Sequence, residues 1–324
     1  MVSTGVVVIG RNEGERLKRC LESVVGAVAA VVYVDSGSTD GSVALAKRLG
    51  VEVLELDMAV PFTAARARNE GFDRLRALLC TVEYVQFVDG DCEVVQGWLR
   101  EAAAYLQAHQ NVAVVCGRRR ERFPQQSVYN GMCDMEWDTP IGEAKACGGD
   151  AMFRVAAFAV ARGYRAELIA GEEPELCVRL RTAGWQVWRL DAEMTWHDAA
   201  MTRFGQWWQR AVRGGHAYAE GAWLHGAPPE RHWVRESRRI WAWGLGLPLT
   251  LLAGLALFGW WGLLLLAVYP LQIVRLAFKG KRSTKENWLH AFFLVLIKFP
   301  ELQGQMTFWW RKLADIQSTL IEYK

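Results

Sequence analysis

Two acidic residues at the end of an apolar segment are the first sign of chemistry in this sequence. Asp89 and Asp91 flank Gly90, directly after the apolar run 84–88. Side chains at the carboxyl ends of strands in open α/β sheets face a ligand-binding crevice, so we expect both carboxylates there. Carboxylate oxygens suit Mg²⁺ or Mn²⁺ held together with a substrate diphosphate. The pair predicts a divalent metal site, although acidic turns after strands are also common as purely structural features.

Two other strand ends are expected at the same crevice. The first expected strand, 5–9, leads into Arg11, Asn12 and Glu13, and the second, 31–35, ends at Asp35. Asp35 is well placed to bond a base or a ribose, but its turn can equally be a strand-to-helix connection rich in capping residues. No GxGxxG fingerprint is present, which argues against a dinucleotide-binding dehydrogenase.

A helical arginine and a pair of glutamates supply further candidates. Arg68, in the helical segment 64–79, can bind a diphosphate by bidentate hydrogen bonds or can simply be solvated. Glu172 and Glu173 precede a helix expected from Pro174. Acids at that position are favourable at the positive end of the helix, which alone could explain them, and one carboxylate could also accept a proton from an attacking hydroxyl.

A histidine completes the set of titratable candidates. His197 follows that helix and offers an imidazole that could complete a metal shell. The alternative is an ordinary packed or surface histidine, and the sequence leaves both open.

The order of the segments predicts an α/β domain followed by a membrane-anchoring region. Short β-branched runs alternate with helical stretches, the pattern of parallel α/β sheets. The expected strands are 5–9, 31–35, 51–56, 84–89 and 112–116, and the expected helices are 15–25, 42–49 and 64–79. We place the first domain at 1–232, with halves 1–116 and 117–232, and the membrane region at 233–324.

Two almost uncharged apolar stretches, 240–258 and 260–278, have the length of membrane-spanning helices. Basic residues flank the pair on both sides, which suits a hairpin with both ends in the cytoplasm. The segment 288–312 is shorter in its apolar part and carries Lys298, so we expect an interfacial or re-entrant helix there. A buried hairpin in a soluble domain is the alternative.

Composition limits the classes of function. The chain has 324 residues and a net charge of only +3, which gives no general attraction to nucleic acid. Seven scattered cysteines form no CxxC pair, which favours reduced thiols in a cytosolic setting. The N-terminus shows no signal-peptide pattern, so the first domain is expected to face the cytoplasm from the inner membrane.

Taken in order, these motifs resemble family 2 of the inverting glycosyltransferases, which have the GT-A fold, a Rossmann-like mixed sheet flanked by helices. The resemblance covers about 6–219. The matching positions are Val7 to Glu13, Asp35 to Gly41, Ala67 to Gly71, Asp89 to Asp91 and Gly171 to Leu176. Arg11 stands where the family often has an aromatic residue, Ser36 where a second acid is usual, and Glu173 where the base is usually Asp.

The resemblance implies a role for each motif. A nucleotide-sugar donor, expected to be a UDP-sugar, would be held by Ile9, Arg11, Asn12, Glu13, Asp35, Arg68, Asn69, Asp89, Gly90 and Asp91. Asp91 would be the principal metal ligand, with Asp89 and His197 assisting. Glu173 would be the base beside Glu172, and the segment from Gly148 through Gly149 to Asp150 would face the acceptor.

The expected activity is transfer of a sugar to a hydroxyl of a lipid-linked or membrane-associated acceptor in cell-envelope or exopolysaccharide assembly. The arginines 118, 119, 120 and 122 could face anionic headgroups or an acceptor diphosphate, or be a solvated charge run. Transfer to a polyprenyl phosphate is the alternative, although a phosphate needs no base. A processive synthase would need more spans, and a non-catalytic membrane scaffold would not need both Asp89 and Asp91.

Overall fold

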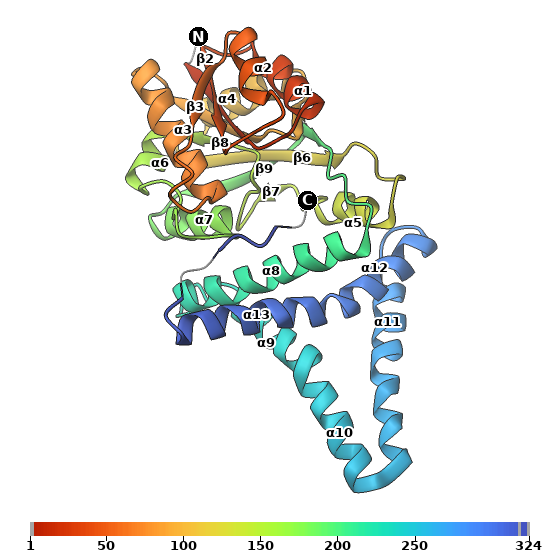
Figure 1. Ribbon diagram of the computed structural model, residues 1–324. Coiled ribbons are helices and arrows are strands. Elements are labelled where there is room, and N and C mark those ends of the chain that lie inside the picture. The colour runs from red at the N-terminus through yellow and green to blue at the C-terminus, as the bar shows by residue number, and fades with distance from the viewer. Residues whose placement is uncertain (1–2, 317–318, 323–324) are drawn as a thin grey trace. The chain divides into compact units, whose positions relative to one another are not determined.

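The computed structural model describes residues 3–316 and 319–322. The chain forms two compact units, Met1–Thr202 and Arg203–Lys324. Figure 1 shows the sheet of the first unit and the helices of the second.

The first unit is built on one nine-stranded sheet in the order β3-β2-β1-β4-β8-β6-β9-β5, with β7 paired to β9. The strands are β1 (Thr4–Gly10), β2 (Ala30–Asp35), β3 (Glu52–Glu55), β4 (Tyr84–Asp89), β5 (Cys92–Val94), β6 (Val112–Glu121), β7 (Gly142–Glu143), β8 (Ala151–Arg154) and β9 (Gln186–His197). The five strands expected from the sequence are all present, and β6 extends beyond its expected end.

The first four strands of this order are parallel, and their carboxyl ends form one edge. In the register of the sheet, Gly10 of β1 lies opposite Asp35 of β2, and Ile9 lies opposite Asp89 of β4. The chain order reverses at β1, which has β2 on one side and β4 on the other, and ligands of open α/β sheets bind at such a reversal. The remaining strands join through antiparallel β8, which makes the sheet mixed.

Helices cover the sheet and bury its apolar side chains. They are α1 (Glu15–Val24), α2 (Ser42–Arg48), α3 (Ala64–Leu78), α4 (Trp98–Ala108), α5 (Val128–Glu136), α6 (Val155–Val160) and α7 (Glu172–Thr182). α3 approaches the sheet closely at Gly71, where a Cβ atom would lie 2.5 Å from a methyl of Val7 and 2.7 Å from one of Val34. Only glycine allows this approach, which brings Arg68 of the same helix to the edge of the sheet.

The second unit is helical. Its elements are α8 (Phe204–His225), α9 (Val234–Trp241), the π-helical turn η1 (Ala242–Gly246), α10 (Leu247–Phe258), the 3₁₀ segment η2 (Gly259–Ala267), α11 (Val268–Lys279), α12 (Thr284–Leu296) and α13 (Lys298–Leu313). α8 and α13 run alongside each other in Figure 1. Their backbones nearly touch, because a Cβ at Gly215 would lie 2.0 Å from the carbonyl oxygen of Glu301 and one at Gly304 would lie 2.0 Å from that of Val212.

An apolar helical hairpin projects from these helices. One continuous helical run in the described residues, Val234–Lys279, is long and apolar enough to cross a membrane, and 11% of its most apolar window is buried. Gly259, with φ of 58°, divides the run into two arms, which α10 and α11 form in Figure 1. Large apolar side chains of the hairpin, including Leu257, Trp260 and Phe278, are exposed. Two separate spans remain a prediction.

Three expected boundaries differ in the structure. The first unit ends at Thr202 rather than 232, because α8 packs on α13 and so belongs with the C-terminal helices. The expected division at 116 falls inside β6, which runs unbroken through the sheet. The expected single helix 288–312 is two helices, α12 and α13, which meet at Ile297.

Neighbouring glycines of α8 should respond in opposite ways to alanine. Gly215→Ala forces a methyl into the backbone of Glu301, and overpacking of this kind typically costs 1–3 kcal/mol, so we expect about that loss of stability. At Gly214 a Cβ meets nothing within 4 Å, so Gly214→Ala should stabilise the helix by up to about 1 kcal/mol. Thermal unfolding of the detergent-purified variants measures both effects. Equal melting temperatures for the two variants would contradict the close α8–α13 contact.

Candidate active site

The turns after β1 and β2 are tied together by hydrogen bonds. The amide of Asn12 donates to Ser38 Oγ at 2.9 Å, and the Thr39 amide donates to Asn12 Oδ1 at 2.7 Å. Asp35 is buried and accepts hydrogen bonds from the Gly37 and Ser38 amides at 3.0 and 2.8 Å. Its carboxylate therefore stabilises the turn in this structure, and binding of a base or ribose by Asp35 stays a prediction.

Gly90 lets the acidic turn after β4 lie against β1. Its amide donates to the carbonyl oxygen of Ile9 at 2.8 Å, and a Cβ at this position would lie 3.1 Å from the same oxygen. Asp89 ends β4, and Asp91 precedes β5. The two acids therefore lie on either side of a tight turn, at the edge of the sheet where the sequence predicts them.

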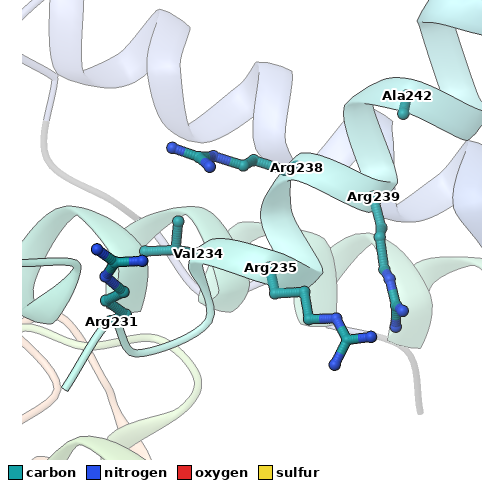
Figure 2. Close-up of a pocket in the computed structure, with 6 residues that line it drawn as sticks. All are labelled: Arg231, Val234, Arg235, Arg238, Arg239 and Ala242. Atoms are coloured by element: carbon teal, nitrogen blue, oxygen red, sulfur yellow. The ribbon is translucent and has the colours of Figure 1, made fainter. Parts of the chain in front are cut away.

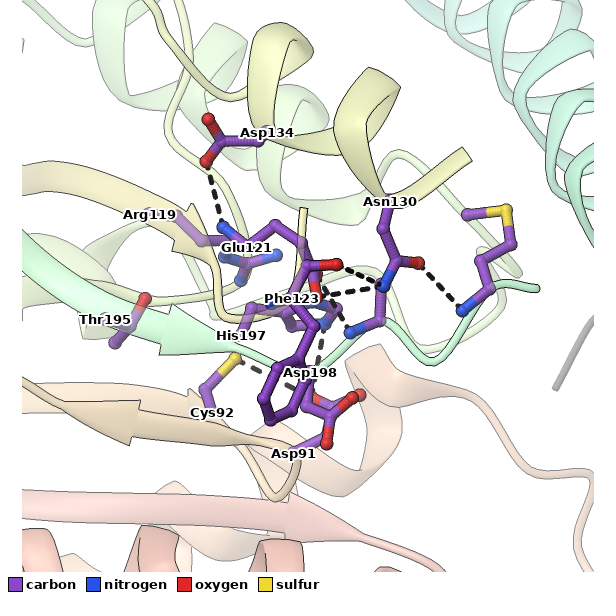
Figure 3. A network of polar contacts seen from close by, with 12 residues as sticks. Asp91, Cys92, Arg119, Glu121, Phe123, Asn130, Asp134, Thr195, His197 and Asp198 are labelled. Atoms are coloured by element: carbon purple, nitrogen blue, oxygen red, sulfur yellow. Dashed lines mark hydrogen bonds and ion pairs between the residues drawn. The ribbon is translucent and has the colours of Figure 1, made fainter. Parts of the chain in front are cut away.

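Pairing of β5 with β9 brings Asp91 and His197 together. Cys92 lies opposite His197 in the antiparallel register, and the Nε2 atom of His197 is 3.3 Å from Asp91 Oδ1. On the other side of the imidazole, Nδ1 is 3.7 Å from the buried carboxylate of Glu121. Figure 3 shows His197 among these acidic side chains.

The ligand atoms of Asp91, Cys92 and His197 lie within 4.8 Å of one another, so they could hold a metal ion. Burial raises the pKa of the Cys92 thiol well above its usual value, and a thiol must lose its proton to bind a metal ion. A carboxylate oxygen and an imidazole nitrogen are the other two donors. A second possible group consists of Asp89, Cys92 and Asp150.

Arg68 links Asp89, at the end of β4, to the two glutamates of α7. Its guanidinium is buried and lies 2.8 Å from Asp89, 2.8 Å from Glu172 and 3.1 Å from Glu173. The two glutamates occupy the first turn of α7 after Gly171, which has φ of 80°. Glu173 is the more accessible of the pair, with 14% of its side chain exposed against 4% for Glu172.

A second arginine, Arg119 of β6, also pairs with Asp89. Its guanidinium lies 2.9 Å from Asp150 and 3.5 Å from Asp89, and it stacks on the ring of Trp137. Asp150 is fully buried, and it also accepts hydrogen bonds from the Asp89 amide and from Thr195 Oγ1. Asp150 therefore fixes Arg119 and Asp89 in place.

The charges of this cluster do not balance. Asp89, Asp150, Glu172 and Glu173 face the two guanidiniums of Arg68 and Arg119. Burial opposes ionisation of Asp89, but both arginines outweigh it and hold the pKa of Asp89 well below its usual value. Burial, reinforced by the charge of Glu172, raises the pKa of Glu173 to about 7. Glu173 is therefore the carboxyl of the cluster that exchanges a proton near neutrality.

At Gly149 the backbone lies directly against the charged groups of the cluster. A Cβ there would lie 2.6 Å from the Arg68 guanidinium, 3.0 Å from the Asp89 carboxylate and 3.1 Å from that of Glu173. Gly148 is exposed beside it. Contact of these glycines with an acceptor stays a prediction, whereas the buried Asp150 has its carboxylate engaged within the protein.

Asn69 has its side chain engaged within the protein, and its binding of the donor stays a prediction. Its side chain donates to the Tyr164 carbonyl at 2.7 Å and accepts from the Tyr164 amide at 2.9 Å. Both ends of the amide thus hold the segment that precedes α7. Of the other expected donor-site residues, Arg11 is exposed and Glu13 pairs with Arg16 at 2.7 Å.

Sequence reasoning missed Glu121, Thr195 and the pairing of Arg119 with Asp89 and Asp150, which all involve β6 or β9. The strand predicted from the sequence ended at residue 116, whereas β6 continues to Glu121. Side chains alternate along a strand, so a longer predicted strand would have placed Arg119 and Glu121 on the same face. The four arginines, for which the sequence left headgroups, an acceptor diphosphate or solvent as possible contacts, pair with acids of the first unit: Arg118 with Asp134, Arg119 with Asp150, Arg120 with Glu193 and Arg122 with Glu93. Contact of these arginines with either anion stays a prediction.

The comparisons with known proteins agree with the geometry. The model of "Glycosyl transferase family 2" matches residues 5–162, most of the first unit. The N-terminal unit is therefore similar to this family over most of its length. The chain is 29% identical over 202 residues to the "Succinoglycan biosynthesis protein ExoA" of Rhizobium meliloti (strain 1021), covering 58% of this chain and 61% of the relative. An "Uncharacterized glycosyltransferase" of Rickettsia felis is 29% identical over 111 residues, 34% of this chain and 36% of that protein. The chain therefore matches less than two thirds of the length of either relative.

Solved structures show the same fold. The mannosyltransferase PcManGT from Pyrobaculum calidifontis, in complex with GDP-Man and Mn²⁺, superposes with a TM-score of 0.61 at 16% identity, covering 95% of this chain and 87% of that one. S. aureus TarS 1–349 gives a TM-score of 0.52 at 16% identity, covering 94% and 92%. The predicted GT-A fold is confirmed.

Removing the charge of Glu173 should stabilise the protein above neutral pH. Between the pKa of an ordinary glutamate and about 7, the unfolded state releases this proton before the folded state does, so the free energy of unfolding falls as pH rises. Glu173→Gln lacks this penalty. Measured in EDTA, its melting temperature should exceed that of the unmodified protein by a few degrees at about pH 8 and by less at about pH 5. Glu22→Gln, on the exposed face of α1, is the control. A difference that does not change with pH would contradict a raised pKa at Glu173.

Proposed function

We propose that this protein is an inverting glycosyltransferase that moves a sugar from a nucleoside diphosphate sugar to a hydroxyl of a lipid-linked or membrane-associated acceptor. The observation that carries the proposal is Arg68, which holds Asp89 of the strand edge and Glu173 of α7 around one guanidinium. The same guanidinium thereby holds Asp89, an acid of the proposed donor site, and Glu173, the proposed base with its raised pKa. The match of residues 5–162 to the model of glycosyl transferase family 2 supports the same reaction.

In the proposed reaction, the acceptor hydroxyl attacks the anomeric carbon of the donor sugar. The hydroxyl proton passes to a carboxylate oxygen of Glu173, and the new bond forms between the acceptor oxygen and the anomeric carbon. The bond from that carbon to the diphosphate breaks, and the nucleoside diphosphate leaves with the electron pair. A carboxylate with a pKa of about 7 is suited to this role, because about half of it is ionised near neutral pH and it is still basic enough to take the proton.

The residues of the site fit a divalent metal ion. Asp91 and His197 offer an oxygen and a nitrogen 3.3 Å apart, and the carboxylates of the neighbouring cluster outnumber its arginines. When bound, the ion would offset the charge that develops on the departing diphosphate. Mg²⁺ prefers oxygen ligands, so the imidazole favours Mn²⁺, the ion named in the PcManGT complex.

The acceptor class and the location rest on the hairpin and on the relative in succinoglycan biosynthesis. The apolar hairpin of the second unit would keep the protein at the inner membrane, with the N-terminal unit on the cytoplasmic side, where nucleotide sugars are made. Cell-envelope or exopolysaccharide assembly is the process that fits this position and ExoA. The family resemblance favours a uridine nucleotide as the donor, whereas the PcManGT complex contains GDP-Man, so both are included in the test.

Nucleoside diphosphate release from a panel of UDP-, GDP- and TDP-sugars tests the proposal. The detergent-purified full chain would be assayed with membrane lipid extract and Mn²⁺. We expect release from one donor. Loss of a general base should lower the rate by about 10²–10⁴-fold in Glu173→Gln, with the KM for the donor little changed.

Two outcomes would change the assignment. Full activity of Glu173→Gln would favour transfer to a polyprenyl phosphate, whose oxygen needs no base. No release and no metal-dependent nucleotide binding would favour a non-catalytic scaffold. Glu22→Gln is the matched control, since it makes the same chemical change on the exposed face of α1.

The metal assignment has a readout independent of activity. Titration of Mn²⁺ followed by electron paramagnetic resonance should show binding to the unmodified protein and its loss in Asp91→Asn. Glu121→Gln should weaken binding by about 10–100-fold, the usual effect of removing a group that orients a metal-binding histidine. Asp73→Asn, at an exposed position of α3, is the control. Unchanged Mn²⁺ affinity in Asp91→Asn would contradict the site.

A further inference from the structure

Four arginines surround a hollow on the second unit at the start of the apolar hairpin. The hollow has a volume of about 370 Å³ and is lined by Arg231, Val234, Arg235, Arg238, Arg239 and Ala242. Figure 2 shows these side chains spread around α9. All four arginines are exposed.

None of these arginines makes an ion pair with another residue in the part of the chain that the structure describes. By contrast, the arginines of β6 each lie beside an acid. The one acidic residue of α9 is Glu236. Like charges this close repel one another, so the cluster favours a negatively charged ligand.

The face of α9 opposite the hollow contacts neighbouring helices, which fixes the position of the helix that carries the arginines. Ile240 is fully buried, and Ser237 Oγ donates to Gln305 Oε1 of α13 at 2.9 Å. Just before α9, the ring of Trp233 lies 2.5 Å from the point where a Cβ at Gly221 of α8 would stand. A helix held by two others presents its arginines at low conformational cost to a ligand.

The position of α9 identifies the kind of anion. α9 continues without a break into η1 and α10, the first arm of the apolar hairpin, so the arginines lie where the polar chain becomes apolar. In a bilayer this boundary falls at the phosphate groups of the lipids. Guanidinium groups bind phosphate oxygens through paired hydrogen bonds, and a soluble anion would not need an adjoining apolar helix.

We propose that the arginine hollow of α9 binds the phosphate headgroup of an anionic phospholipid at the membrane surface. Val234 and Ala242 supply apolar contacts beside the guanidiniums. The inference does not depend on sugar transfer, and it would hold for a catalytically inactive protein of the same fold. Salt weakens such a contact, since the arginines are exposed.

Thermal shift of the full chain in neutral detergent micelles tests the site. The probes are short-chain phosphatidylglycerol, short-chain phosphatidylcholine and inorganic pyrophosphate. We expect phosphatidylglycerol to raise the melting temperature of the unmodified protein, and phosphatidylcholine, which has the same phosphate but no net charge, to have little effect. Arg235→Gln/Arg238→Gln/Arg239→Gln should bind phosphatidylglycerol at least about tenfold more weakly.

The matched control removes three exposed arginines from the first unit, Arg48→Gln/Arg76→Gln/Arg100→Gln, and changes the net charge equally. It should respond to phosphatidylglycerol like the unmodified protein. If the triple α9 variant melts abnormally without lipid, the three single variants replace it, each with a smaller expected loss. An equal response of the α9 variants and the control would overturn the proposal. Pyrophosphate acting as strongly as phosphatidylglycerol would also overturn it, because the ligand would then be a soluble anion.

Discussion

The buried guanidinium of Arg68 is the constraint on which the candidate active site depends. It lies between Asp89 of the sheet and the two glutamates of α7, elements that are far apart in the sequence. A buried arginine is stable only with partners that compensate its charge, and buried carboxylates have the same requirement. The arginine and the acids therefore hold one another in place. Burial, reinforced by the excess of carboxylates, raises the pKa of Glu173, and the same excess leaves the site receptive to a cation.

Close backbone approaches make this charge cluster possible. Gly71 lets α3 lie against β1 and β2, and Gly149 leaves room for Arg68 and Glu173 to meet above the sheet. Gly90 brings the acidic turn against the end of β1. Gly71 removes a side chain where α3 meets apolar methyl groups of the sheet, whereas Gly90 and Gly149 remove one where polar groups approach backbone or another charge. These positions have no chemistry of their own, yet the distances between the reactive groups follow from them.

The parallel half of the sheet and its acidic edge could be predicted from the sequence, because strand, turn and helix signals there are local. Asp89, Asp91 and Glu173 stood beside such signals. The role of Arg119 could not be found, because β6 continues past its apolar stretch into a charged one, held by pairing with the long β9. Asn69 and Asp150 carried the right chemistry for ligand binding, but their partners are in distant segments and only the fold shows them. The end of the first unit was missed for the same reason, since α8 is defined by its contact with α13.

The contact between α8 and α13 has a consequence for the order in which the second unit can assemble. α8 is synthesised first, but the partner that covers its glycines, α13, is synthesised only after the whole apolar hairpin. Until then the glycine face of α8 has no helix against it. The hairpin is therefore synthesised in full before α8 and α13 can pack against each other, so this contact can only form around a hairpin whose chain is already complete.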